Sequence, residues 1–282
     1  MDSEVRKYPF WVRLCLVLFG FLCVALFCFI RFPYDTLKDR IEDVLSSSLG
    51  VELALGHLHP GFPMNIVADD VAINSIPVAD FARFRPGISG LLQGRAVVFY
   101  NVIQDQSKAE GMVGLSPGDS AKPVHVLAHL EDVDVGAFRG FMGPHGEALE
   151  GLVDADLDLT ARPGRLYRAS GDLSAVWKTG KMPLLLHGVP LDSIGFEDIR
   201  IKARMDKGMI IIETAQMNGD ISGSLRGRVH LRPDVSQCRL NLTGEVRLPP
   251  GLSSIAGIQG GKDGLRFSLR GTPGSPRFKI LK

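Results

Sequence analysis

Residues 239–248 read RLNLTGEVRL, and leucine, glycine and valine alternate there with polar residues. Successive side chains of a β-strand point to opposite faces, so this stretch predicts a strand with one apolar and one wet face. Residues 199–206, 225–232 and 265–270 repeat the same alternation. Together these segments predict a sheet whose apolar face packs against another layer, curls on itself or forms an open groove.

The apolar positions of these strands are the candidate lining of a groove that would take an apolar ligand such as phospholipid. They are Ile199, Ile201, Leu225, Val229, Leu231, Leu240, Leu242, Val246, Leu265, Phe267 and Leu269. The alternate positions are mostly Arg and Lys, which predicts a basic surface on the other face of the sheet.

Short segments of this kind recur between Gly, Pro and Asp turns over most of the chain, with few helical stretches. Helical turns are expected only at 86–94 and 135–142, and His57–Pro63 is expected to interrupt the strands. The predicted fold is mainly β, an elongated and curled antiparallel sheet that forms a trough or a sandwich. We expect its strands near 51–55, 65–73, 78–84, 95–104, 109–115, 123–133, 148–160, 168–178, 183–187, 195–206, 208–217, 221–232, 237–248, 264–271 and 276–280.

The longest apolar stretch is WVRLCLVLFGFLCVALFCFI at residues 11–30, and it has no charge between Leu14 and Ile30. Those residues would span about 25 Å as a helix, close to the hydrocarbon thickness of a bilayer. A secretory signal peptide is the alternative, but this run is longer and lacks a small-residue cleavage site. The predicted anchor is represented by Trp11, Leu14, Phe19, Leu22, Phe27 and Ile30.

The anchor divides the chain into a tail at 1–10, a transmembrane segment at 11–31, an amphipathic helix at 32–50 and a β-rich domain at 51–282. The short tail favours a cytoplasmic N-terminus and a translocated body, although the bias in Lys and Arg is slight. A subdivision near residue 192 is an alternative, because residues 35–192 hold 21 acidic and 13 basic side chains while 193–282 hold 8 and 15.

Residues that could carry chemistry are few. Asp154, Asp156 and Asp158 share one strand face, where a solvated surface is favoured over a calcium site because the known calcium loops are absent. The pairs His57/His59 and His125/His129 are interpreted as ordinary histidines rather than metal ligands. No Walker loop, GxSxG or HExxH motif occurs, so we expect no enzyme and no cofactor, although a site assembled from distant residues stays an alternative.

Two further classes of site are not favoured. Cys238 is the single cysteine of the β-rich domain, so this domain has no internal disulfide. Lys and Arg do not interleave with stacking aromatic residues, so nucleic acid is not an expected partner.

Several of these segments resemble the type II secretion system protein N (GspN) family. They are FPYDTLKDRI (32–41), LGVEL (49–53), LHPGFP (58–63), VADDVAI (67–73) and LRFSLRGTPGSPRF (265–278). More distantly, the anchor, the helix and the closing strands resemble AsmA-like envelope proteins.

The GspN resemblance implies a non-catalytic, single-pass inner-membrane protein of a Gram-negative bacterium, with a β-rich periplasmic body. Its expected partners are other components of the type II protein secretion system. The AsmA-like resemblance implies a lipid-binding or lipid-handling envelope protein instead, with a hydrophobic groove that shields lipid tails.

Overall fold

The computed structural model describes residues 10–49, 52–62, 65–87, 90, 96–115, 123–137, 149–162, 166–183, 193–232, 237–247, 264–272 and 275–281. These residues form two helices at the start of the chain, followed by one long antiparallel sheet of fifteen strands. The prediction of a mainly β fold with an elongated antiparallel sheet is therefore confirmed. The described strands do not form a two-sheet sandwich, because all fifteen belong to the same sheet.

Helix α1 (Phe10–Ile30) is apolar over its 21 residues, and none of them is buried. It is long and apolar enough for a membrane span or a signal sequence. The residues predicted to form the anchor all lie on α1 with exposed side chains: Trp11, Leu14, Phe19, Leu22, Phe27 and Ile30.

The strands follow one another along the sheet almost in chain order. They are β1 (Leu53–Ala54), β2 (Leu58–Gly61), β3 (Asn65–Ile73), β4 (Ile76–Pro86), β5 (Ala96–Gln104), β6 (Ser107–Leu115), β7 (Val124–Asp134), β8 (Glu150–Ala161), β9 (Ser170–Pro183), β10 (Ser193–Asp206), β11 (Met209–Gly219), β12 (Ser222–His230), β13 (Arg239–Arg247), β14 (Leu265–Thr272) and β15 (Ser275–Leu281). From β3 to β15 each strand pairs with the next, while β1 and β2 both pair with β3.

Tight turns explain this sequential order. Asn74 and Ser75, between β3 and β4, have φ angles of 50° and 64°, and Lys207 and Gly208, between β10 and β11, have 45° and 99°. Positive φ at two successive turn residues matches the right-handed twist of the strands in a two-residue hairpin. Each such hairpin returns the chain beside the strand that it has just left.

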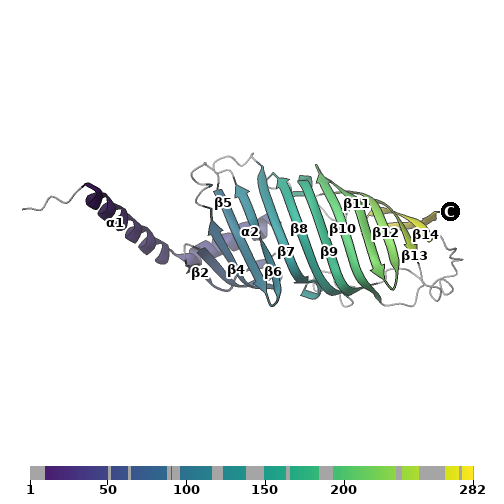
Figure 1. Cartoon of the computed structure of the whole chain (residues 1–282), viewed down its shortest axis with the longest axis horizontal. Helices are drawn as coiled ribbons and strands as arrows, with labels where there is room; N and C mark the ends of the chain where they lie inside the picture. The colour runs from purple at the N-terminus through teal and green to yellow at the C-terminus, as the bar shows by residue number, and fades with distance from the viewer. Residues whose placement is uncertain are drawn as a thin grey trace, which may run out of the picture.

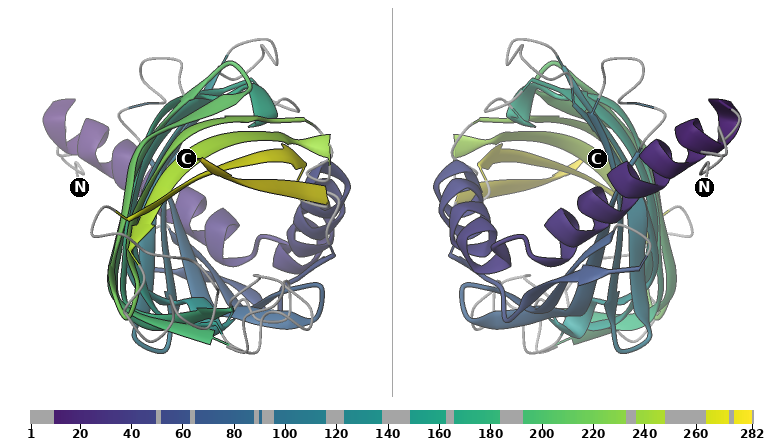
Figure 2. Two further views of the ribbon diagram at one scale, coloured as in Figure 1. Left: turned by 90° about the vertical axis from the view of Figure 1, so that its right-hand side faces the viewer. Right: turned by 90° about the vertical axis from the view of Figure 1, so that its left-hand side faces the viewer.

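The sheet stays open (Figures 1 and 2). Figure 1 shows α1 projecting from one end and the C-terminal strands at the other. Figure 2 looks along the sheet and shows it curved but not closed, with α2 (Tyr34–Leu49) on the concave side. At about 4.8 Å per strand, the fourteen strands of the main path span roughly 60 Å. The strands on the two sides of the possible boundary near residue 192 belong to one sheet, since β9 and β10 pair along most of their length.

Strand positions differ from expectation in a few places. The segment His57–Pro63 was expected to interrupt the strands, but Leu58–Gly61 forms the short strand β2 against β3. Its proline does not prevent this, because β2 lies off the main path, where one side of a strand needs no partner. Leu166–Arg168, where a strand was predicted to begin, form a short helical turn. The expected helical turns at 86–94 and 135–142 and the expected strand at 183–187 lie largely outside the described residues.

Helix α2 packs on the first strands and forms the clearest hydrophobic core of the described chain. Its apolar side touches buried residues of β1–β4 and the segment between them. The buried members are Tyr34, Leu55, Leu58, Ala68 and Ala82, and Leu37, Ile41, Leu53, Ile66, Val71 and Val102 pack around them. Burying such side chains contributes about 25 cal/mol per Å² of apolar surface, which holds α2 against this end of the sheet.

Polar side chains of α2 also satisfy the backbone of the first strand segment. Ser46 Oγ accepts a hydrogen bond from Leu53 N at 3.0 Å, and Glu42 Oε1 accepts one from Leu55 N at 2.6 Å. Lys38 Nζ donates to the Gly56 carbonyl at 2.8 Å. Free strand edges invite pairing with other chains, so α2 protects this end of the sheet.

Candidate functional site

We call the face of the sheet on which α2 lies the inner face. Residues that are paired directly across neighbouring strands form a row that crosses the inner face from β2 to β15. This row consists almost entirely of apolar and small residues. It runs Leu58, Ala68, Ala82, Val102, Ala109, Leu130, Ala155, Ala175, Ile201, Ala215, Leu225, Gly244, Phe267 and Ile280. The neighbouring rows are similar, so the inner face forms an apolar channel floor along the length of the sheet.

Helix α2 covers only the first part of this floor. The apolar residues packed around the α2 core reach no further than Val102 on β5. From β6 onward no other described segment lies over the inner face, and most of its side chains are only half-buried. Contiguous exposed apolar surface of this extent marks a binding surface rather than the ordinary exterior of a soluble protein.

Glycines let large side chains lie flat along the floor. A Cβ built on Gly244 would come within 2.6 Å of the Phe267 ring, so this ring covers the glycine of the next strand. Phe267 also stacks on Phe278, with ring centroids 5.1 Å apart and planes 25° apart. At the other end, Tyr100 reaches across Gly111 and donates its hydroxyl proton to the Leu127 carbonyl at 3.1 Å. The resulting floor is smooth and aromatic at both ends.

The structure brings the predicted groove residues together on this inner face. They come from β10 (Ile199, Ile201), β12 (Leu225, Val229), β13 (Leu240, Leu242, Val246) and β14 (Leu265, Phe267, Leu269). Leu231 lies just after β12, where its N–H donates to the Gly208 carbonyl. Ile199 and Leu242 are buried and the others are half-buried.

Other inner-face residues were absent from the predicted lining. Tyr100, Leu130, Leu157, Leu173, Trp177 and Met217 lie on the same floor. Residues 96–104 are apolar at nearly every position, so alternation cannot tell which side chains face inward. In β8, by contrast, the alternation of Leu157 and Leu159 with aspartates was a usable signal.

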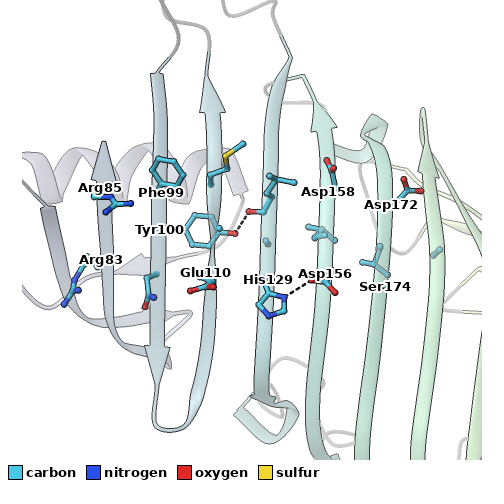
Figure 3. A pocket seen from close by; sticks show the side chains of 18 of the residues that line it. Arg83, Arg85, Phe99, Tyr100, Glu110, His129, Asp156, Asp158, Asp172 and Ser174 are labelled. Atoms are coloured by element: carbon cyan, nitrogen blue, oxygen red, sulfur yellow. Dashed lines mark hydrogen bonds and ion pairs between the residues drawn. The ribbon is translucent and has the colours of Figure 1, made fainter. Parts of the chain in front are cut away.

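The opposite, outer face carries the charged residues of the middle strands, and they pair across strands. His125 Nε2 lies 2.7 Å from Asp158 Oδ1, and His129 Nδ1 lies 2.7 Å from Asp156 Oδ1. Figure 3 shows His129 and Asp156 pointing toward one another from neighbouring strands. The hydrogen bond to Asp156, together with nearby Glu131 and Glu110, raises the pKa of His129 above its ordinary value.

Asp154, the third aspartate of the strand, contacts a lysine instead. Lys178 Nζ lies 2.6 Å from Asp154 Oδ2 and 2.8 Å from Asp132 Oδ1. These two carboxylates raise the pKa of Lys178, and Lys178 lowers that of Asp154. Within the described chain, no cluster of His, Cys, Asp and Glu could hold a metal ion. The three aspartates therefore sit in a ladder of cross-strand contacts.

A shallow hollow of about 1070 Å³ lies on this outer face, between β4 and β11 (Figure 3). Its polar lining changes sign along the sheet, from Arg83 and Arg85 through Asp156, Asp158 and Asp172. The guanidinium of Arg85 stacks over the Phe99 ring at 5.4 Å. The three aspartates of the hollow already contact His129, His125 and Arg204, so it offers less to a ligand than the apolar inner face.

No protein family, no curated protein and no solved structure matches this chain. The geometry of the inner face and the position of α1 are therefore the features that point to a function.

Proposed function

We propose that this chain is a non-catalytic, membrane-anchored protein of the bacterial envelope that holds lipid acyl chains along the inner face of its sheet. The observation that carries the proposal is the open apolar floor from β6 to β15, which no described helix or second sheet covers. Keeping this surface in water costs about 25 cal/mol per Å² of apolar area. Acyl chains remove that cost and need no polar partner.

The proposal uses α1 as an uncleaved inner-membrane anchor, with the N-terminus in the cytoplasm and the sheet in the periplasm. Supporting this role, α1 is joined to the sheet by a fixed corner. Tyr34 donates its hydroxyl proton to the Phe29 carbonyl at 2.7 Å, and its ring packs edge-on against Phe29 and Phe32. Because Tyr34 is also part of the α2 core, the corner ties the membrane end of the chain to the first strands.

This arrangement would keep the α2 end of the channel beside the bilayer surface. A lipid leaving the bilayer there would have to pass α2, which covers the floor as far as β5, before its acyl chains meet the uncovered apolar side chains from β6 onward. Those side chains would lower the free-energy cost of taking the acyl chains out of the bilayer. No reacting group is needed for such a role.

The test measures the phospholipid that purifies with the full chain, by mass spectrometry. Val229→Lys places an ammonium group on the half-buried inner face of β12, and Ser224→Lys places the same group on the exposed outer face of that strand. We expect Val229→Lys to carry clearly less lipid than the wild type and Ser224→Lys to carry as much. Equal lipid in all three proteins would refute the proposal, because α1 alone would then account for the lipid.

A second proposal concerns the process that this protein serves. The segments that resemble the GspN family include the anchor-proximal helix and the last two strands, which favours a component of a type II protein secretion system. Deleting the gene should then impair export of folded proteins across the outer membrane. Complementing the deletion strain with the Val229→Lys gene tests whether export also needs lipid binding. Normal export in the deletion strain would exclude this process and leave lipid handling as the role.

A further inference from the structure

The outer face of the last four strands is strongly basic. In the described parts of β12–β15 the one carboxylate is Glu245, whereas eight exposed cationic side chains lie on that face: Arg226, Arg228, Arg239, Arg247, Arg266, Arg270, Arg277 and Lys279. Glu245 lies within 4.0 Å of both Arg247 and Arg266. The other six form no ion pair with any described residue. The excess of basic residues in the last part of the sequence thus gathers on one surface. We call the surface formed by these eight cations the C-terminal basic face.

This face differs from the middle of the sheet, which also carries cations. There Arg200 contacts Asp198, Arg204 contacts Asp172, and Lys178 contacts two aspartates. On the C-terminal basic face, Arg270 and Arg277 instead stand directly opposite each other on paired strands. Like charges in directly opposed positions destabilise a sheet. An anion bound between Arg270 and Arg277 would therefore relieve their repulsion.

The opposed arginines border a hollow of about 500 Å³ on the outer face of the β14–β15 hairpin. Arg270, Arg277 and Lys279 line it together with hydroxyl-bearing side chains of Ser268, Thr272 and Ser275. Guanidinium and ammonium groups beside hydroxyl donors form the usual binding environment of a phosphate.

Exposed apolar residues lie on the same hairpin. Phe278 is 47% exposed, Ile280 is 45% exposed and Leu281 is 39% exposed. Leu281 lies beside the cations on the outer face, while Phe278 and Ile280 occupy the inner face of the same strand. The cations together with Leu281 on the same face match a lipid surface, where phosphates and acyl chains lie a few ångströms apart.

We infer that the outer face of the β14–β15 hairpin binds the phosphate headgroups of an anionic lipid surface. Figure 1 shows this hairpin at the end of the sheet opposite α1, so the surface that it meets is separate from the bilayer segment that holds α1. The inference concerns the outer face and does not depend on the acyl-chain binding proposed for the inner face.

The experiment places the full chain in nanodiscs of phosphatidylcholine and adds vesicles in trans. One set of vesicles contains phosphatidylglycerol mixed with phosphatidylcholine, and the other contains phosphatidylcholine alone. The triple variant Arg270→Gln/Arg277→Gln/Lys279→Gln removes three cations from the hairpin. The matched control Arg200→Gln/Lys202→Gln/Arg204→Gln removes three cations from the outer face of β10, and circular dichroism checks that both variants fold.

We expect the wild type and the β10 variant to float with the phosphatidylglycerol vesicles only. The hairpin variant should bind them on the order of a hundredfold more weakly, since each basic residue near an anionic surface contributes about fivefold. Unchanged binding by the hairpin variant would overturn the inference. So would equal binding to both vesicle types, tight binding of soluble glycerol phosphate, or binding of a poly-glutamate peptide without binding of vesicles. Lipid on the inner face is measured separately, so either proposal can fail while the other stands.

Discussion

At the scale of single residues, the outer face is organised by contacts that join one strand to the next. His129 shows the physical consequence most directly, because its imidazole lies against the Asp156 carboxylate while half of its side chain stays exposed. A group in this position adds little to stability, but its contribution depends on pH with a definite sign.

The pKa of His129 is raised in the folded state, so protonated His129 stabilises the fold below its unfolded pKa of about 6.5. This contribution is lost as the pH rises through the higher folded pKa. We expect the stability difference between the wild type and His129→Gln to be larger at acidic than at alkaline pH. Proton NMR should show the His129 pKa falling in Asp156→Asn. An unchanged His129 pKa in that variant would show that the pair does not cause the shift.

Gly227 provides a second residue-scale prediction. Its φ of +144° is unfavourable for other residues, and an added Cβ would lie 2.4 Å from the Asn241 carbonyl oxygen of the next strand. Gly227→Ala should therefore destabilise the protein by about 1–3 kcal/mol in urea unfolding. Gly114→Ala is the control, because its added Cβ would stay 3.8 Å from the nearest atom. Equal stability of the two variants would contradict the close strand packing at Gly227.

At the scale of elements, α2 is the piece that ends the sheet and connects it to α1. Its hydrogen bonds to the first strand segment predict a local effect. Glu42→Ala removes the acceptor for Leu55 N–H, so amide exchange at Leu55 should accelerate by about tenfold or more. Asp43→Ala, an exposed change on the next residue of α2, should leave Leu55 unaffected. Equal protection of Leu55 in both variants would show that Glu42 does not secure this strand.

Strands of the second half of the sheet could be predicted from the sequence because each has one polar face. The alternation in residues 239–248 places Leu240, Leu242 and Val246 on one face, as found. For residues 96–104 a strand could be predicted, but not which side chains face inward, because both faces of the strand are apolar. The cross-strand partners of the aspartates were also out of reach, since the register of β7 against β8 includes a bulge near Leu130 that no local pattern encodes.

Openness of the channel was likewise beyond the sequence, which left a trough and a sandwich as alternatives. An open trough and a closed sandwich differ in how much the free energy of unfolding falls when a charge is placed at different inner-face positions. Leu242 is 6% exposed, whereas Val229 is half-buried. Leu242→Lys should cost about 3 kcal/mol or more, and Val229→Lys should cost much less because its ammonium group can reach water. Comparable destabilisation in urea unfolding would indicate a closed core.

At the scale of the whole molecule, the chain combines a membrane-length helix, a fixed corner at Tyr34 and a sheet of roughly 60 Å whose two faces differ in chemistry. The inner face is apolar and open, and the outer face is charged, with cations at its far end that form no ion pair with any described residue. The two proposals use different faces: acyl chains would lie on the inner face, and the phosphates of a separate lipid surface would meet the C-terminal basic face.

Site-specific photo-crosslinking in bacterial cells can show whether acyl chains lie on the inner face. A photoreactive amino acid is introduced at Leu225 or Ile201 on the inner face, and at the adjacent Arg226 or Lys202 on the outer face. We predict that phospholipid adducts form from Leu225 and Ile201 and are rare from Arg226 and Lys202. Adducts of equal yield from both faces, or none from the inner face, would mean that acyl chains do not bind on the inner face.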